Sequence, residues 1–216
     1  MPLLGQDLSG SLSRRVAILG PGLIGGSLAL ALSRVGQPWQ VSVWARREEA
    51  ALEAAALLPR CHVSCDLASV LADCDIAVLC MSPQAIQHCG EDLKTQLPAS
   101  ATITDAGSVK ANIVETLEIT FGGRFIGAHP MAGSDQSGIR AARADLFEGA
   151  TCILTPTPQS EAKALENTRA LWTATGCKLR EMTPQNHDRA VGRISHLPHA
   201  AASCLVHAAL AQDPTL

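Results

Sequence analysis

Aromatic residues are scarce in this 216-residue chain, and neither sign of charge is in large excess. The sequence has three Trp, three Phe and no Tyr, and 17 Lys and Arg stand against 20 Asp and Glu, for a formal net charge of −3. Proteins that bind nucleic acid or anionic membranes usually present a basic face, which this balance does not favour. No stretch approaches the roughly 18 uninterrupted apolar residues of a membrane span. We therefore expect neither nucleic acid nor membrane as a partner.

The chain also lacks any Cys-x-x-Cys pair, although it has eight cysteines. Cys61 and Cys65 are four residues apart, with no second pair to complete a zinc site. Most of the cysteines lie in or beside apolar segments, where cysteine behaves as a small hydrophobic residue. These are Cys65, Cys74, Cys80, Cys89, Cys152 and Cys204. We predict reduced thiols, a cytoplasmic location and no metal site.

Short β-branched runs alternate with longer amphipathic stretches. The expected strands are residues 16–20, 41–45, 62–64, 75–81, 101–107, 124–130, 151–156 and 177–182. The expected helices are 23–36, 48–58, 82–97, 109–121 and 160–175, and 131–150 form a long loop with one helical turn at "ARADLF". Alternation of this kind is typical of βαβ units that build a parallel sheet. We predict a doubly wound, mostly parallel α/β domain of the Rossmann type over residues 14–182.

The two ends of the chain differ from this pattern. Residues 1–13 lack a basic region followed by an apolar run, and we expect a disordered leader there instead of a signal peptide. Thr183 is suited to cap a helix whose first position is Pro184. We predict that this helix starts a second, α-helical domain over residues 183–216.

The stretch "GPGLIG" follows the first expected strand and opens the first expected helix. In this G-x-G-x-x-G spacing, Gly20 permits the tight turn, Gly22 lets the backbone approach a pyrophosphate, and Gly25 lets helix pack on strand. The helix start, with Leu23 and Ile24, offers unpaired N–H groups to the anion. These residues predict a dinucleotide site; the alternative is a merely structural tight turn.

The end of the second strand indicates which nicotinamide cofactor binds. An NAD site usually has Asp or Glu about 20 residues beyond the last glycine. Ala45 holds that place here, and Arg46 and Arg47 follow it. Two guanidinium groups suit a 2′-phosphate, so we predict NADP over NAD; alternatively, both arginines are solvated charges. Ser82, the expected cap of the helix after residues 75–81, is a further expected cofactor contact.

His129 is the candidate general base. It ends an expected strand and precedes Pro130, on a loop beyond the carboxyl end of the sheet. A histidine titrates near neutral pH and can take a proton from a hydroxyl. Ser108, on the loop after the preceding strand, is placed to orient it. A packing or capping histidine is the alternative.

The segment "SHLPH" (195–199) carries two histidines on an expected helix. Ser195 and His199 are four apart and share a face, whereas His196 is turned about 100° away. We predict Ser195 and His199 in a pocket and His196 either in the core or behind the pocket residues, and we expect Pro198 to kink the helix. A metal site is a weaker alternative, because no acidic or Cys ligand accompanies the histidines at fitting spacing.

Four motifs together, "GPGLIGGS", "DAGSVK" (105–110), "GAHPMAGSDQSG" (127–138) and "SHLPH", resemble the prephenate/arogenate dehydrogenase family of tyrosine biosynthesis. The resemblance implies oxidative decarboxylation of prephenate or arogenate to 4-hydroxyphenylpyruvate or tyrosine, with hydride passing to the nicotinamide. It implies that His129 acts on the ring 4-hydroxyl and that Ser108 orients it. It also implies substrate contacts from Ser195 and His199, and from Lys110 and Ser134.

The family's helical domain forms a homodimer and supplies an arginine for the substrate's side-chain carboxylate. That part extends beyond the start seen at residues 183–216, so the arginine has no counterpart here, while a homodimer is implied. Other readings are an NADP-dependent reductase such as a pyrroline-carboxylate reductase or β-hydroxyacid dehydrogenase, and a non-catalytic NADP-binding remnant. The choice between prephenate and arogenate stays open.

Overall fold

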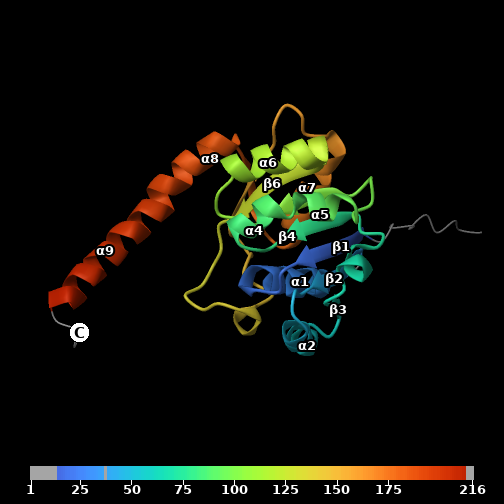
Figure 1. Ribbon diagram of the computed structural model, residues 1–216, viewed down its shortest axis with the longest axis horizontal. Coiled ribbons are helices and arrows are strands. Elements are labelled where there is room, and N and C mark those ends of the chain that lie inside the picture. The colour runs from blue at the N-terminus through green and yellow to red at the C-terminus, as the bar shows by residue number, and fades with distance from the viewer. Residues whose placement is uncertain (1–13, 37, 213–216) are drawn as a thin grey trace, which may run out of the picture.

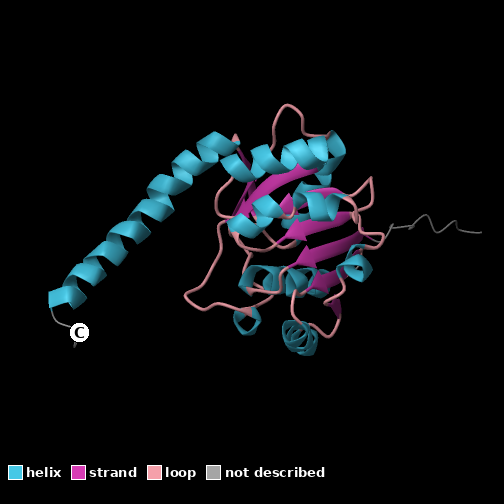
Figure 2. Cartoon of the chain, in the orientation of Figure 1, coloured by secondary structure: helices cyan, strands magenta, loops and turns pink. Residues whose placement is uncertain are grey.

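The computed structural model describes residues 14–36 and 38–212 (Figures 1 and 2). The leader expected over residues 1–13 lies outside the described residues. The strands of the described part form one sheet in the order β3-β2-β1-β4-β5-β6-β7-β8. Neighbouring strands are parallel, except that β6 and β7 are antiparallel. This order confirms the predicted doubly wound, mostly parallel sheet.

The elements follow the predicted alternation closely. The strands are β1 (Arg14–Leu19), β2 (Trp39–Trp44), β3 (His62–Ser64), β4 (Ile76–Leu79), β5 (Thr102–Asp105), β6 (Phe125–Pro130), β7 (Thr151–Thr155) and β8 (Lys178–Glu181). The α-helices are α1 (Leu23–Val35), α2 (Glu48–Leu57), α3 (Leu67–Leu71), α4 (Pro83–His88), α5 (Gly90–Lys94), α6 (Ala111–Phe121), α7 (Ala162–Ala174), α8 (Pro184–Val191) and α9 (Leu197–Gln212). Two 3₁₀ turns, η1 (Gly122–Arg124) and η2 (Ile139–Ala141), and a π-helical turn, η3 (Gly192–His196), complete the described chain.

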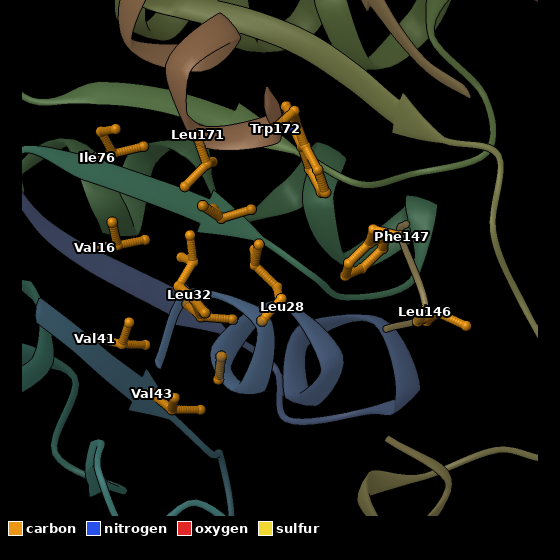
Figure 3. Close-up of a cluster of buried hydrophobic side chains, with 14 of the residues drawn as sticks. Val16, Leu28, Leu32, Val41, Val43, Ile76, Leu146, Phe147, Leu171 and Trp172 are labelled. Carbon is orange, nitrogen blue, oxygen red and sulfur yellow. The ribbon is translucent and has the colours of Figure 1, made fainter. Parts of the chain in front are cut away.

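Hydrophobic cores lie on both faces of the sheet. Along β1, Val16 and Ile18 pack on one face with α1 and α7, while Ala17 and Leu19 pack on the other with α3 to α6. Figure 3 shows the first of these cores, where Trp172 of α7 is buried. Strands covered on both faces must be apolar at every position, which explains the nearly continuous hydrophobic runs of β1 and β4.

The helices differ from the prediction in three places. The helix expected over 82–97 is two helices, α4 and α5, which meet at Cys89. A Cβ on Gly90 would lie 3.1 Å from Thr120 Oγ1, so glycine permits α5 to pack closely on α6. Helix α3 was not expected; Asp66 caps it by accepting a hydrogen bond from Ala68 N at 3.1 Å. In the 131–150 loop the helical turn is η2, just before "ARADLF".

Helix α8 packs on α6, and from its end η3 and α9 project from the sheet domain as a rod (Figure 1). The Leu197 N–H donates to Gly192 O, five residues back, as in a π-helix. Pro198 has no N–H for the carbonyl of residue 194. A π turn thus precedes Pro198, and the helix continues through it as α9; the kink expected at Pro198 stays a prediction. No helix in the described ranges is both long and apolar enough to cross a membrane.

Candidate active site

The glycine loop joins β1 to α1 where the sheet order changes direction, between β1 and β4. Gly20 has φ +108°, and a Cβ there would lie 2.5 Å from Cys80 O. A Cβ on Gly25 would lie 2.0 Å from Gly20 O, so no larger residue fits. Gly22 differs, because it caps α1 with no side-chain hydrogen bond and has open space around its Cβ position. The first and third glycines serve the backbone turn, and the second leaves room for a ligand.

The residues after the motif hold the long loop against α1. A Cβ on Gly26 would lie 2.3 Å from the Ile139 side chain, which packs over this position. Ser27 is buried, and its Oγ accepts a hydrogen bond from Arg143 N at 3.0 Å. These contacts fix the 131–150 loop at both η2 and Arg143. The exposed stretch before them is thereby held near the carboxyl ends of the strands.

A cavity of about 330 Å³ lies beside the glycine loop. Gly20, Trp44, Arg46, Arg47, Met81 and Ser82 are among its lining residues. None of the described residues that line it is acidic, and both arginine side chains are exposed. Ser82 Oγ accepts from Ala85 N at 3.3 Å, which confirms its expected role as the cap of α4. The open helix start and this cavity fit a nicotinamide dinucleotide, with room for its pyrophosphate at the start of α1.

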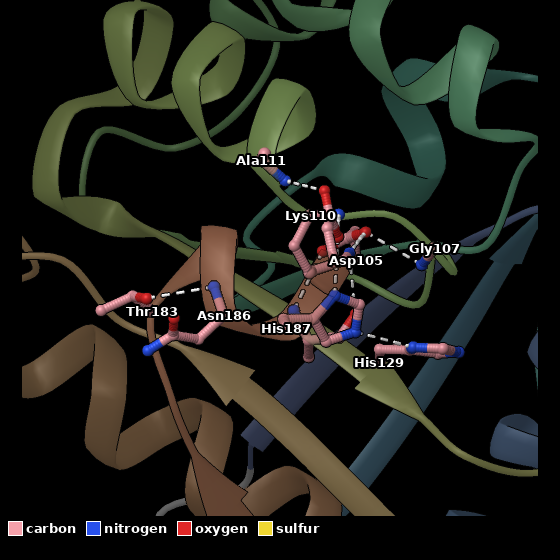
Figure 4. A network of polar contacts seen from close by, with 10 residues as sticks. Asp105, Gly107, Lys110, Ala111, His129, Thr183, Asn186 and His187 are labelled. Atoms are coloured by element: carbon pink, nitrogen blue, oxygen red, sulfur yellow. Dashed lines mark hydrogen bonds and ion pairs between the residues drawn. The ribbon is translucent and has the colours of Figure 1, made fainter. Parts of the chain in front are cut away.

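His129 ends β6 and lies at the start of a chain of polar contacts (Figure 4). Its Nδ1 lies 2.9 Å from His187 Nε2, and His187 Nδ1 lies 2.7 Å from Asp188 Oδ1. Asp188 also accepts the main-chain N–H groups of Lys110, at 2.7 Å, and Ala111, at 2.9 Å. The start of α6 thus fixes Asp188, which in turn orients His187 and His129.

This chain of contacts determines where the protons lie. Ionised Asp188 can only accept, so His187 Nδ1 must carry a hydrogen and donate it. In a neutral His187 the other nitrogen, Nε2, is then an acceptor, and His129 Nδ1 must donate to it. The remaining nitrogen of His129, Nε2, keeps its lone pair. The arrangement therefore presents a base.

The surroundings keep His129 neutral. Burial lowers its pKa from 6.5 to about 3, and the charges of His187, Lys110 and His196 act in the same direction. Burial also lowers the pKa of His187, against the opposing effect of Asp188. Burial raises the pKa of Asp188, but the hydrogen bonds it accepts from Ala111, His187 and Lys110 outweigh this and leave its pKa lowered. His129 and His187 are thereby neutral and Asp188 is ionised at neutral pH, and these are the protonation states that the hydrogen bonds require.

Lys110 lies beneath this chain and not in an open pocket. Its side chain and that of Asp105 are both fully buried and form an ion pair. Lys110 Nζ also donates to Ala128 O at 3.0 Å, and Asp105 Oδ1 accepts from Ala128 N at 3.0 Å. Burial lowers the pKa of the Lys110 ammonium, and Asp105 opposes this. The expected contact of Lys110 with substrate has no support in this geometry.

The two serines expected in the site, Ser108 and Ser134, are both exposed. Ser108 is exposed, and within the described residues no hydrogen bond joins it to His129; His187 holds the orienting place instead. Ser134 is exposed in its loop, where Oγ donates to Asp135 Oδ1 at 3.0 Å. The missed residue, His187, had one sequence signal: an adjacent His-Asp pair in the first turns of a capped helix.

The "SHLPH" segment lies on the projecting rod. Ser195 is half-buried and His199 exposed, with His199 Nδ1 3.3 Å from Ser195 O, as expected for residues on one face. Of the two positions expected for His196, the core position is wrong: its side chain is exposed, because the rod has left the sheet domain. Its charge nevertheless acts on His129. In the described part of the chain, no three His, Cys, Asp or Glu side chains are grouped to hold a metal ion.

The glycine loop at the switch in strand order and a neutral histidine near the carboxyl end of β6 define a Rossmann-type dinucleotide-binding domain with a candidate base beside it. The chain belongs to the prephenate dehydrogenase family. Its nucleotide-binding domain, described as "Prephenate dehydrogenase, nucleotide-binding domain", matches residues 28–181, and "Prephenate dehydrogenase, dimerization domain" matches 183–215. This membership removes the other reductase groups as alternatives.

Individual relatives agree with this assignment. The chain is 32% identical to a prephenate dehydrogenase of Bacillus subtilis over 198 residues, which are 89% of this chain and 53% of that protein. The crystal structure of Aquifex aeolicus prephenate dehydrogenase with hydroxyphenyl propionate and NAD+ is 34% identical, with a TM-score of 0.84 over 92% of this chain and 70% of that one. Synechocystis arogenate dehydrogenase is also 34% identical, with a TM-score of 0.80 over 91% and 69%. The chain thus spans about half the length of the Bacillus relative.

Proposed function

We propose that this chain carries the cofactor site and the base of an NADP-dependent prephenate or arogenate dehydrogenase. The observation that carries the proposal is the contact chain from Asp188 through His187 to His129, which leaves His129 Nε2 unprotonated. At neutral pH His129 Nε2 has a free lone pair, which can accept the proton of a hydroxyl group. The names of the relatives support this substrate class, and their printed substrates include both candidates.

The protein's part in the reaction is the movement of one proton. His129 Nε2 takes the proton of the ring 4-hydroxyl as hydride leaves the same carbon. The bound nicotinamide supplies the hydride acceptor. The bond between ring C1 and its carboxylate breaks, its electron pair enters the ring, and carbon dioxide leaves. The ring becomes aromatic, and the proton held at Nε2 returns to the phenolate oxygen. One cofactor is reduced for each carbon dioxide released.

NADP is the proposed cofactor because the cavity beside the glycine loop is cationic. Arg46 and Arg47 line it, and no carboxylate among the described lining residues would repel a 2′-phosphate or bind a ribose diol. Gly22 would admit the pyrophosphate at the open start of α1. The NAD+ in the Aquifex structure makes the preference a matter for direct measurement.

The proposed substrate contacts, Ser195 and His199, extend from the rod towards solvent together with apolar side chains. The exposed hydrophobic residues of this part are Ile194, Leu197, Leu205, Val206 and Leu210, exposed by 40% to 72%. Exposed apolar side chains gathered on one element mark an interaction surface. Together with the match to a dimerization domain, they support a homodimer formed through α8 and α9.

The decisive experiment is a steady-state assay of prephenate and arogenate, each with NAD and with NADP. We expect reduced-cofactor formation with one of the substrates and a higher kcat/KM with NADP. Arg46→Glu should raise the Kd for NADP by about 10- to 100-fold and leave that for NAD nearly unchanged. Arg180, exposed on β8, offers a matched control in Arg180→Glu. Cofactor binding without turnover of either substrate would support the non-catalytic remnant instead.

A further inference from the structure

The buried pair of Asp105 and Lys110 has no role in the proposed proton transfer. Both side chains are fully buried, 0% exposed, at the end of β5 and the start of α6. Burying two charges costs free energy, and an apolar pair of similar volume is often as stable or more so. Stability therefore does not explain well why two charged side chains are buried here. Their hydrogen bonds to the neighbouring strand explain it better.

The pair replaces strand pairing where β5 ends. Strands β5 and β6 pair only at Ile103 with Phe125 and Thr104 with Ile126. Beyond Ile126, β6 pairs with β7 on its other side, where His129 lies opposite Ile153. The edge of Ala128 that faces β5 meets side chains instead: Asp105 Oδ1 accepts its N–H, and Lys110 Nζ donates to its carbonyl. The two side chains thus take the place of a further β5 residue and pair with Ala128, the residue just before His129.

Lys110 also acts on the ring of His129 by a second path. Its main-chain N–H donates to Asp188 Oδ1, which in turn accepts from His187. His187 contacts the His129 ring at 2.9 Å. The side chain of Lys110 therefore fixes the backbone before His129, and its main chain fixes the partners of the His129 ring (Figure 4).

We propose that the Asp105–Lys110 pair positions His129, holding both its backbone and its ring where the sheet opens. Lys110 is then a positioning residue and not a substrate contact. The expected loss of catalytic rate on changing the pair rests on the proposed function, whereas the expected change in the position of the His129 ring does not. A misplacement of a reacting group by about 1 Å can cost about 100-fold in rate.

The test compares the variants Lys110→Met and Asp105→Asn/Lys110→Met with the full chain. The double variant removes the carboxylate that the single change would leave buried without its partner. Lys163→Met, at an exposed lysine of α7, is the matched control. Both test variants should lower kcat by about 10- to 100-fold and leave KM and the Kd for NADP within about threefold. The control should match the wild type.

Two further readouts separate positioning from general damage. In 15N spectra of the histidines, the wild type should show His129 with its proton on Nδ1, and the variants a mixture of tautomers. The acid limb of the kcat/KM profile should also move, since Lys110, His187 and His196 face His129 from α6, α8 and η3, with Asp105 and Asp188 close to them. The titration of Cys152 on β7, near Lys110, is followed as well.

Two results would overturn the proposal. One is a folded double variant with wild-type kcat and an unchanged His129 tautomer. The other is a double variant that fails to fold, because the pair would then serve the fold itself. If the wild type turns over neither substrate, the proposed function fails. The histidine spectra still decide whether the pair positions the ring.

Discussion

The chain carries histidines in two contrasting settings. His129 and His187 lie between the sheet and α8, where each ring nitrogen that faces the protein has a partner. His196 and His199 lie on the rod formed by η3 and α9, where both are exposed, and His199 contacts only its own helix backbone among the described residues. The first pair is preorganised by the fold described. The second pair belongs to a surface that the described residues leave open.

This difference places the proposed proton transfer in one region of the molecule and the proposed substrate binding in another. The hydrogen bonds that orient His129 and its partners come from β5, β6, the start of α6 and α8. The proposed substrate residues lie on an element that has left the sheet domain. Changes in the first region should alter the rate of the chemical step, whereas changes in the second should alter substrate affinity.

The largest expected effect is at His129. His129→Gln should lower kcat by about 100- to 10,000-fold, because general-base catalysis contributes a factor of this size. The Kd for NADP, measured by fluorescence titration, should stay within about threefold, since His129 does not line the cavity beside the glycine loop. His62→Gln, at an exposed position of β3, is the control. Equal kcat in the two variants would remove His129 from the chemistry.

A smaller effect is expected on the rod. His199→Ala should raise KM by about tenfold with little change in the Kd for NADP, as expected for a substrate contact worth about 1.4 kcal/mol. His196→Ala should leave the free energy of unfolding within about 0.5 kcal/mol, because the side chain is exposed. Urea titration and steady-state kinetics measure the two outcomes. A strongly destabilised His196 variant would contradict the exposed position and indicate that His196 is buried.

A third effect concerns the pH dependence of stability. Both His129 and His187 have lowered pKa values, so the unfolded chain binds more protons than the folded one below about pH 6.5. The free energy of unfolding should therefore fall as pH falls from 6.5 towards 4, by up to about 1.4 kcal/mol per pH unit for each histidine.

His129→Gln should flatten this slope, because one of the two groups no longer titrates. His199→Gln, on the exposed rod, should not. Asp188 has a lowered pKa as well, and its contribution is lost only below its ordinary value of 3.8, outside this window. Urea unfolding at intervals between pH 4 and 7 measures the slopes. Parallel curves for the wild type and His129→Gln contradict a buried neutral His129.

Local patterns made much of the fold predictable. Apolar runs covered on both faces revealed the strands, and the glycine spacing placed the turn after β1, since both depend on neighbouring residues. The contacts around His129 could not be predicted from local sequence patterns. His187 lies 58 residues further along the chain, and only the docking of α8 on α6 brings it to His129.

Lys110, expected as a substrate contact from the family resemblance, shows what such a resemblance does not reveal about the surroundings of a residue. A lysine in a motif beside a predicted strand end is usually exposed, and nothing local reveals that Asp105 and Ala128 enclose it. His196 shows the opposite error. Its apolar neighbours suggested burial, but apolar sequence does not distinguish a packed helix from one whose apolar side chains face an interface.

The central claim is that His129 is neutral with its proton on Nδ1, so that Nε2 is free to accept a proton. The most direct measurement is the 15N spectrum of the histidine side chains at pH 7, with His129 assigned by its loss in His129→Gln. The account predicts the Nδ1–H tautomer for His129 and its persistence at pH 5, well below the ordinary histidine value of about 6.5. An imidazolium at pH 7, or the Nε2–H tautomer, would contradict it.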